Sequence, residues 1–179
     1  MSLLQEAKVR RHYTVTGFVS AQGYTLLHWH VKNRMWLPPG GHIEPDEDPT
    51  QTALREVMEE TGLAVELLPT SASFHYASPI QITAPVTIMV EDIPDTPNEP
   101  AHQHIDLIYF TAPSARGMQT PPNGAWQWVS ADALKQGKPM AAGAEMTPAA
   151  VAEDVRVLGI AAIERAAVEE RAYHISRKV

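Results

Sequence analysis

The chain has 179 residues, of which 44% are hydrophobic and 20% are charged, and this composition predicts one globular domain over residues 1–179 with its own core. Because the chain has no cysteine, disulfides, thiolate metal sites and a cysteine nucleophile are all excluded. The formal net charge of −7 disfavours duplex nucleic acid and anionic membranes as partners, since binding to either depends on clustered Lys and Arg.

The N-terminal segment, MSLLQEAKVRR, lacks the apolar stretch of a secretory signal peptide. No apolar run elsewhere approaches the length that a membrane-spanning helix needs. We therefore expect a cytoplasmic protein.

The first predicted elements lie between His12 and Val31, where the β-rich runs HYTVTGFVS and YTLLHWHV flank the turn signal AlaGlnGly. This pattern is typical of a β-hairpin. The next stretch, MWLPPGGHIEPDEDP, is rich in Pro and Gly, and we expect it to form a long loop.

A helix is predicted from about Pro49 to Thr61. Asp48 is suited to cap its N-terminus, Pro49 fits the first helical position, and Gln51 stands where the partner in a capping box would stand. Gly62 is a natural C-terminal stop. Start and stop signals therefore agree on the same segment.

Several strands are expected after this helix, interrupted by a polar, Pro-rich loop at residues 91–104. Their predicted ranges are 63–68, 73–76, 80–90 and 105–111. A last strand at 126–130 is expected to lead directly into a short helix.

A C-terminal helix is predicted to open at Thr147 and Pro148 and to run toward Tyr173. One stripe of this helix is apolar, and we expect it to contact the core or a second copy of the chain. The stripe consists of Val151, Val155, Leu158 and Ala162. Gly159 is expected to weaken the helix in its middle.

Three glutamates of the helix Pro49–Thr61 share one face, because Glu56, Glu59 and Glu60 are related by i,i+3 and i,i+4 spacing. Carboxylates this close repel one another unless a cation lies among them. Their hard oxygen atoms favour Mg²⁺, or Mn²⁺, over zinc, and Mg²⁺ commonly joins carboxylates to substrate phosphates. The three glutamates alone also fit a solvated acidic face, which is the usual situation for a Glu-rich helix.

Two further residues are expected to support a metal site. Arg55 precedes Glu59 by one helical turn, so it can orient that carboxylate, with a contact to phosphate as the alternative. Gly40 lies in the segment ProProGlyGly, which allows close backbone approach, and its carbonyl oxygen is a candidate metal ligand.

The segment 41–63, GHIEPDEDPTQTALREVMEETGL, resembles a complete Nudix box. The box pattern is Gly, five residues, Glu, seven residues, ArgGlu, an aliphatic residue, any residue, GluGlu, any residue, Gly and an aliphatic residue. Every specified position matches: Gly41, Glu47, Arg55, Glu56, Val57, Glu59, Glu60, Gly62 and Leu63. A chance match at a given start has a probability on the order of 10⁻⁹ to 10⁻¹⁰ from ordinary residue frequencies.

The resemblance implies an α/β/α sandwich with a central mixed β-sheet, in which the box forms a loop, a helix and a loop, followed by a C-terminal helix. It implies a MutT-like, Mg²⁺-dependent hydrolase that directs water at one phosphorus of a nucleoside diphosphate linked to another moiety. Implied metal ligands are Gly40, Glu56, Glu59 and Glu60, and the implied catalytic set is Glu47, Arg55, Glu59 and Glu60. Homodimers are common in this family, so a homodimer is allowed.

Many members of the family use a further glutamate from a loop beyond the box, yet residues 107–131 contain no Asp or Glu. The general base therefore has several candidates: Glu99, His102, His104, Glu59 and Glu60. Strand alternation would place His102, His104 and Asp106 on one face, where they could contact substrate or metal or simply face solvent.

The four tryptophans suggest a platform for a nucleotide base, although core packing is the commoner role of a tryptophan. Trp36 and Phe74 are the preferred candidates because they are close to the box in sequence. Together with Glu99, His102 and His104 they form the predicted substrate-binding set.

The leading functional hypothesis is hydrolysis of a nucleotide-like diphosphate substrate, with nucleoside triphosphates or their oxidised forms slightly ahead of ADP-ribose, nucleotide sugars and dinucleoside polyphosphates. The alternative is a catalytically silent Nudix fold that senses nucleotides or binds protein, against which the intact box argues. A prenyl diphosphate isomerase is disfavoured by the absence of cysteine.

Overall fold

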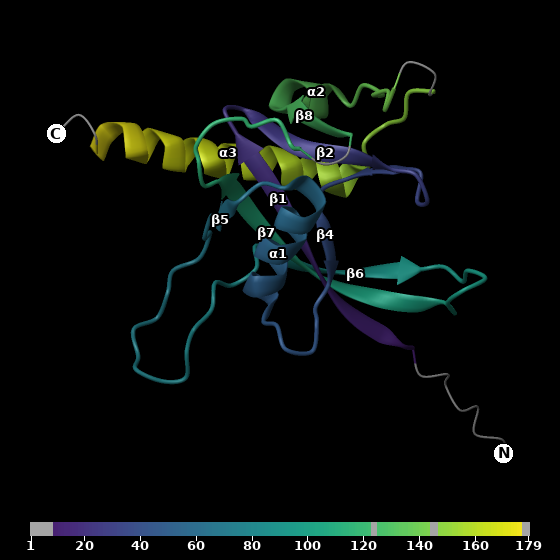
Figure 1. Cartoon of the computed structure of the whole chain (residues 1–179), viewed down its shortest axis with the longest axis horizontal. Coiled ribbons are helices and arrows are strands. Elements are labelled where there is room, and N and C mark those ends of the chain that lie inside the picture. The colour runs from purple at the N-terminus through teal and green to yellow at the C-terminus, as the bar shows by residue number, and fades with distance from the viewer. Residues whose placement is uncertain (1–8, 123–124, 144–146, 177–179) are drawn as a thin grey trace.

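A computed structural model of the protein describes residues 9–122, 125–143 and 147–176. The described strands form one mixed sheet in the order β3-β2-β1-β7-β5, with β4 paired to β1, β6 to β7 and β8 to β2 (Figure 1). The strands are β1 (Arg11–Ala21), β2 (Tyr24–His30), β3 (Met35–Leu37), β4 (Gly40–His42), β5 (Val65–Leu67), β6 (Thr87–Ile93), β7 (His102–Pro113) and β8 (Trp126–Ser130). The helices are α1 (Pro49–Thr61), α2 (Ala131–Gln136) and α3 (Glu153–Ser176).

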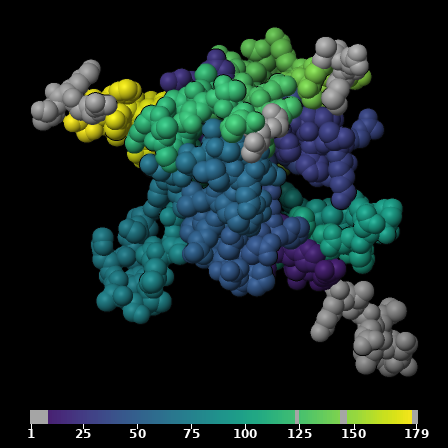
Figure 2. Space-filling view, in the orientation of Figure 1, coloured from purple at the N-terminus to yellow at the C-terminus, as the bar shows by residue number. Residues whose placement is uncertain are grey.

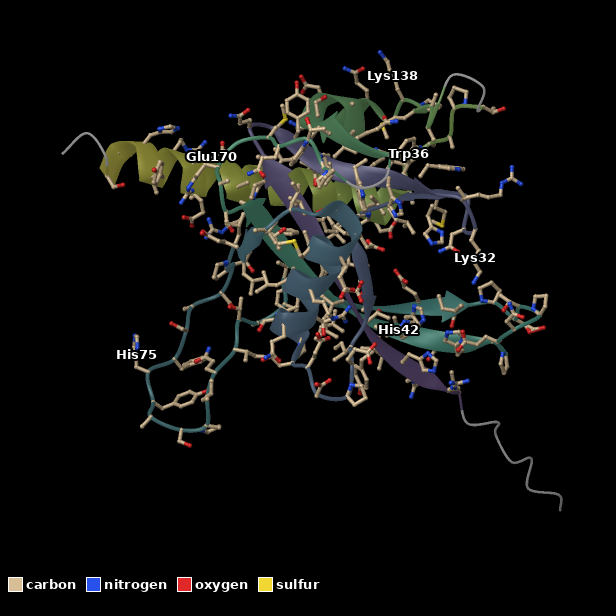
Figure 3. All side chains as sticks on the ribbon, viewed as in Figure 1. Lys32, Trp36, His42, His75, Lys138 and Glu170 are labelled. Atoms are coloured by element: carbon tan, nitrogen blue, oxygen red, sulfur yellow. The ribbon has the colours of Figure 1, made fainter. Side chains whose placement is uncertain are left out.

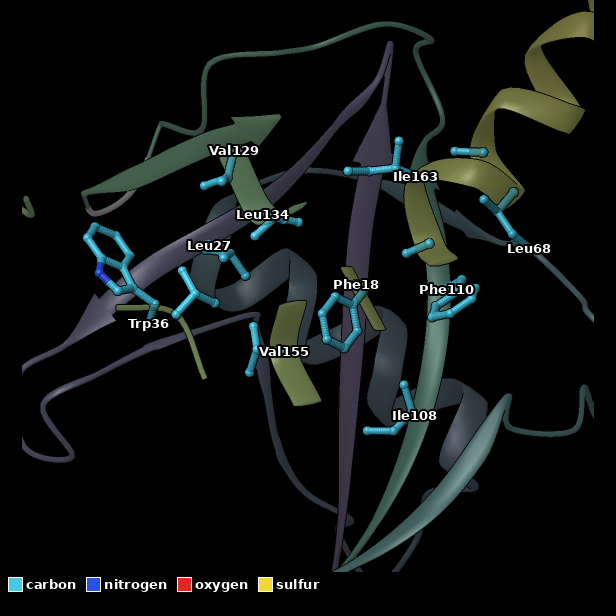
Figure 4. Packing of buried hydrophobic residues seen from close by; sticks show 13 residues of the cluster. Phe18, Leu27, Trp36, Leu68, Ile108, Phe110, Val129, Leu134, Val155 and Ile163 are labelled. Atoms are coloured by element: carbon cyan, nitrogen blue, oxygen red, sulfur yellow. The ribbon is translucent and has the colours of Figure 1, made fainter. Parts of the chain in front are cut away.

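The centre of the sheet is the parallel pair β1 and β7, whose side chains alternate between two helical layers. Phe18 and Ile108 belong to the core cluster that contains Val155 of α3 (Figure 4). Val15 and Tyr109, on the opposite face, pack with Ala53 of α1. Because α1 and α3 cover opposite faces of a mixed sheet, the predicted α/β/α sandwich is confirmed (Figure 1).

The predicted N-terminal hairpin is confirmed, but its two strands separate quickly. β1 and β2 pair at Ser20–Thr25 and Ala21–Tyr24, after which β1 pairs with β4 and β7 instead. The segment predicted as a continuous loop contains the three-residue strands β3 and β4, on either side of Pro38 and Pro39. Such short strands depend on partners elsewhere in the sheet, which local composition does not show.

The helix α1 has the predicted bounds and caps. Asp48 accepts hydrogen bonds from the backbone N–H groups of Thr50 and Gln51, and the Gln51 side chain accepts one from the Asp48 N–H, which completes the capping box. Gly62 ends the helix with φ of 72°, a left-handed conformation that glycine adopts without strain. Local signals alone were sufficient to define this element.

The strand predictions after α1 are partly correct. The ranges 63–68 and 105–111 contain β5 and most of β7, and the predicted strand and short helix at 126–136 are present as β8 and α2. The predicted strand at 73–76 is wrong, because these residues form an exposed loop with no sheet partner in the described structure. The strand predicted at 80–90 is displaced, since β6 covers Thr87–Ile93.

The C-terminal helix starts at Glu153, and the predicted start at Thr147 is wrong because Ala149 instead forms a bridge with Met140. The apolar stripe of this helix was expected to contact either the core or a second copy of the chain. It contacts the core, because Val155 and Ala162 are buried against the sheet. Gly159 is buried where an added Cβ would lie 3.1 Å from Leu134 and 3.2 Å from Thr25. This glycine therefore lets α3 approach the sheet closely.

In the described part of the chain, no helix is long and apolar enough to cross a membrane. The first eight residues, which carry most of the segment considered for a signal peptide, lie outside the described residues.

Candidate active site

The guanidinium group of Arg55 connects the box loop to the glutamates of α1. Its Nε and Nη2 donate to the two carboxylate oxygens of Glu47, at 2.6 and 2.9 Å. Its Nη1 donates to Glu56 at 2.8 Å and to Glu59 at 3.1 Å. The expected pairing of Arg55 with Glu59 is therefore present, and the same side chain also fixes Glu47 and Glu56.

Glu47 is held firmly as a carboxylate. Besides the two bonds from Arg55, it accepts a hydrogen bond from the Thr52 hydroxyl at 2.8 Å. The hydrogen bonds from Arg55 are the main reason that the pKa of Glu47 is lowered to about 2. Partial desolvation acts in the opposite direction, and the hydrogen bond from Thr52 lowers the pKa further. Glu47 is therefore ionised throughout the neutral range and anchors the loop that precedes α1.

Glu60 is partly buried and is held by a backbone group rather than by Arg55. Its carboxylate accepts a hydrogen bond from the Gly40 N–H at 3.2 Å. Burial, with a smaller effect of the negative charges of Glu56 and Glu59, raises the pKa of Glu60 to about 6. The Glu60 backbone carbonyl accepts a hydrogen bond from the Trp126 indole at 3.1 Å, which fixes the end of α1 to β8.

The two glycines before the box lie where a side chain would not fit. A Cβ on Gly41 would overlap the carboxylate of Glu56, and a Cβ on Gly40 would run into the Val15 carbonyl oxygen of β1. Neither glycine has a positive φ, so close approach rather than unusual backbone conformation explains both residues. The expected role of the Gly40 carbonyl as a metal ligand stays a prediction, since the observed contact of Gly40 with the site is through its N–H.

These residues fit a hard divalent cation. Glu56, Glu59 and Glu60 offer oxygen atoms from one helix, and the raised pKa of Glu60 reflects buried negative charge that Arg55 does not contact. A cation among the three carboxylates would remove this penalty. The helix is accessible, because α1 and the box loop lie at the centre of one molecular face (Figure 2).

A model of the NUDIX domain family matches residues 10–150. The chain belongs to the Nudix family. A solved structure of a Nudix-family hydrolase from Clostridium perfringens is similar in fold, with a TM-score of 0.61 and 27% identity over 87% of this chain and 98% of that chain.

Curated relatives share shorter segments with this Nudix chain. A probable DHNTP pyrophosphohydrolase of Lactococcus lactis is 35% identical over 83 residues, which are 45% of this chain and 42% of the relative. The asymmetrical bis(5'-nucleosyl)-tetraphosphatase of Rattus norvegicus is 52% identical over 33 residues, 18% of this chain and 22% of the relative. The matches thus span less than half the length of these relatives.

The structure does not support the prediction that Trp36 stacks on a base. Its side chain is 1% exposed and lies in the core cluster, with its ring centroid 5.7 Å from that of Trp29 (Figure 3). Neither face of the indole is therefore available to a ligand. Phe74 is 77% exposed on the loop between β5 and β6, which projects beside the sheet in Figure 1, and its role in substrate binding stays a prediction.

The remaining predicted residues, Glu99, His102 and His104, lie together, and two unpredicted histidines join them. His12 of β1 has its ring centroid 4.6 Å from that of His102, and His42 of β4 has its ring centroid 5.0 Å from that of His104. We call these five residues the histidine cluster. Burial, reinforced by the neighbouring histidines, lowers the pKa of His104 to about 4, so its ring is neutral at pH 7.

Asp106 follows the histidines on the same face of β7, as alternation predicted, but it is a structural residue here. It is 4% exposed and accepts hydrogen bonds from the hydroxyl groups of Thr14, at 2.9 Å, and Thr16, at 2.8 Å. These bonds connect β7 to β1 beside the segment where β4 pairs.

Sequence reasoning did not single out His12 and His42. No residue near His12 in the sequence marks it as part of a site. Its partner is the distant residue His104, which lies opposite it in the parallel β1–β7 pair. His42 follows Gly41, the first specified position of the Nudix box, but the box pattern allows any residue at the position of His42. Only the pairing of β1 with both β4 and β7 brings the rings together.

Proposed function

We propose that this Nudix chain hydrolyses a diphosphate linkage in a nucleotide-type substrate, using Mg²⁺, or Mn²⁺, held by Glu56, Glu59 and Glu60. The observation that carries the proposal is the way in which the three carboxylates of α1 are held: Arg55 donates hydrogen bonds to Glu56 and Glu59, and the Gly40 N–H donates one to Glu60. A solvated acidic helix face would not require an arginine and a glycine backbone to fix its carboxylates.

The cation, when bound, would polarise phosphoryl oxygens and lower the pKa of a bound water. The residues of the chain supply the geometry for that chemistry. Glu47 keeps Arg55 in place through two hydrogen bonds, and Arg55 holds Glu56 and Glu59 at a fixed spacing. Gly41 leaves room for the Glu56 carboxylate.

Glu60 is one candidate for the group that accepts a proton from the attacking water. Its pKa of about 6 applies to the site without metal, and a bound cation would lower this pKa, so the value does not select Glu60 over the other candidates. Glu59, Glu99, His102 and His104 remain candidates, and a substitution series across pH can separate them, because a base affects the pH profile as well as the rate.

For the substrate we propose a nucleoside triphosphate or a related compound with a chain of three or more phosphates. The names of the relatives, a probable DHNTP pyrophosphohydrolase and an asymmetrical bis(5'-nucleosyl)-tetraphosphatase, support this class, because a triphosphate and a tetraphosphate both contain phosphoanhydride bonds. The net charge of −7 also fits a site in which a cation, rather than the protein surface, attracts the phosphates.

The proposal can be tested by incubating the full chain and Mg²⁺ with nucleoside triphosphates, dihydroneopterin triphosphate, dinucleoside tetraphosphate, ADP-ribose and a nucleotide sugar. Release of phosphate or pyrophosphate is measured in ¹⁸O-labelled water, so that the labelled product shows which phosphorus is attacked. Glu56→Gln, Glu59→Gln and Glu60→Gln should each lower kcat by several orders of magnitude while the circular dichroism spectrum stays unchanged.

Glu44→Gln is the matched control, because Glu44 is an exposed carboxylate in the same loop but at a position the box leaves open. It should keep kcat close to that of the wild type. Turnover by all three helix variants at the wild-type rate would refute the assigned metal site. No turnover of any compound by the wild type would favour a nucleotide sensor instead.

A further inference from the structure

The histidine cluster presents two overlapping sets of potential metal ligands. Ligand atoms of His12, His42 and His104 lie within 4.8 Å of one another, and the same holds for His12, Glu99 and His102. The cluster lies where β1, β4 and β7 meet, and Figure 3 shows His42 at that end of the sheet. It is built mainly of nitrogen donors, unlike the oxygen face of α1.

The orientation of His102 is fixed by the backbone. Its Nδ1 lies 2.9 Å from the Pro100 carbonyl oxygen, which can only accept a hydrogen bond, so Nδ1 carries the proton. The Nε2 lone pair of the neutral ring then faces Nε2 of His104 at 3.2 Å. His102 is therefore held in one orientation beside His104 and limits the positions that the His104 ring can take.

The other rings are held by strand register rather than by loops. His12 lies directly opposite His104 in the parallel β1–β7 pair, and His42 closes the short β4 strand paired to β1. The backbone carbonyl of His42 also accepts a hydrogen bond from Arg55, at 3.2 Å. Ligands carried by rigid strands satisfy a main requirement of a metal site, which is a preformed arrangement.

We propose that the histidine cluster binds one first-row transition-metal dication, for which Zn²⁺ is the probe, through His12, His42 and His104. Imidazole nitrogen suits such ions and not Mg²⁺. With Zn–N bonds of 2.0–2.1 Å, tetrahedral ligand nitrogens lie about 3.3 Å apart. The ligand atoms of these three histidines already lie within 4.8 Å of one another, so a small closure brings them to this spacing.

Glu99 is assigned a supporting position. Its carboxylate is 3.9 Å from both His12 and His102, but it also lies 3.8 Å from the Arg10 guanidinium, which competes for it. It is 40% exposed, whereas the His102 side chain is 2% exposed. His12, His42 and His104 therefore form the ligand set, and Glu99 adds negative charge beside the ion.

The rival explanation is a hydrogen-bonded group of stacked imidazoles without an ion, in which His104 Nε2–H donates to His102. The two explanations differ in a direct measurement. The untagged 179-residue chain, treated with chelator and then dialysed, is titrated with Zn²⁺ by calorimetry in excess Mg²⁺, which fills the proposed glutamate site. We expect one equivalent of zinc to bind, and Co²⁺ to give the absorption bands of a nitrogen-ligated tetrahedral ion.

His42→Gln is the first variant, because His42 is exposed and its loss should not affect folding. It should weaken zinc binding about tenfold or more, as should His12→Gln and His104→Gln. His28→Gln is the matched control: it removes one ring of another histidine pair, whose centroids on β2 are 5.8 Å apart. It should bind zinc like the wild type, and zinc should raise the melting temperature of both.

Equal zinc affinity in wild type, His42→Gln and His12→Gln, or no saturable binding by the wild type, would overturn the proposal. A Glu59→Gln, Glu60→Gln double variant separates it from the proposed hydrolase. Unchanged zinc binding there supports an independent site, and loss of the zinc signal would show that the ion had bound to the glutamates.

Discussion

The two polar clusters of this molecule meet at the adjacent residues Gly41 and His42 and are built on different principles. On the face of α1, charged groups of opposite sign are organised by one guanidinium, that of Arg55. In the histidine cluster, imidazole rings are organised by the register of β1, β4 and β7. The difference teaches that both a contiguous motif and the pairing of distant strands can bring potential metal ligands together, with oxygen atoms in the first case and nitrogen atoms in the second.

His42 and its neighbours join the two clusters. The His42 carbonyl oxygen faces Arg55, while its ring faces His104. Gly41, the preceding residue, lies against Glu56. Substitutions in this segment can therefore show whether the two sites work separately.

Among substitutions at the junction of the two clusters, the largest expected effect comes from Gly41→Ala. The new methyl group would overlap the Glu56 carboxylate, which is the flexible end of a side chain and can move aside. A displacement of about 1 Å in such a group can cost about 100-fold in rate, so kcat should fall by that factor while the melting temperature changes little. Steady-state kinetics and thermal unfolding check both parts, and zinc affinity should stay at the wild-type value.

Gly40→Ala is the contrasting variant. Its methyl group would meet the Val15 backbone carbonyl, which cannot move without disturbing β1. We expect a loss of about 1–3 kcal/mol in the free energy of unfolding, the usual range for overpacking. If Gly41→Ala instead destabilised the fold as much as Gly40→Ala, the separate role of Gly41 in the site would be wrong.

A smaller effect is expected for Arg55→Lys. Lysine cannot reproduce the fork that binds both oxygens of Glu47 while contacting Glu56. Hydrogen bonds to charged groups contribute about 1.5–3 kcal/mol, so urea unfolding should show a loss toward that range together with a lower kcat. Arg10→Lys, at an exposed pair with Glu99, is the control and should change stability by about 0.5 kcal/mol or less. Equal losses in the two variants would show that Arg55 has no special role.

The fold and the box could be predicted where the determining contacts are local. Asp48, Gln51 and Gly62 act within one helix, and their effects are readable without any partner. The strand predicted around Phe74 failed because an apolar, β-prone stretch forms a strand only if a neighbour pairs with it. The start of α3 was placed too early because Thr147 and Pro148 are local start signals, whereas Ala149 pairs with Met140.

The candidate site divides in the same way. Residues that lie one helical turn apart, such as Arg55 and Glu59, were predicted correctly as neighbours. Trp36 was chosen by closeness in sequence, although burial in the core removes it from any ligand. His12 was missed because its position beside His104 depends on the parallel crossing of β1 and β7, a pairing between distant segments.

The smallest expected effect is the pH dependence of the contribution that Glu47 makes to the stability of the fold. The pKa of Glu47 is lowered to about 2 in the folded chain, chiefly by hydrogen bonds from Arg55, against an ordinary value of 4.5. A carboxylate with a lowered folded pKa stabilises the fold above its unfolded pKa, and this contribution is lost as pH falls from about 4.5 toward 2. Glu47→Gln should therefore be less stable than the wild type at pH 7 and approach it near pH 2, in urea unfolding curves recorded across this range. Glu44→Gln, the exposed control in the same loop, should run parallel to the wild type. A constant gap between Glu47→Gln and the wild type down to pH 2 would mean that packing of this side chain, rather than its charge beside Arg55, holds the box loop.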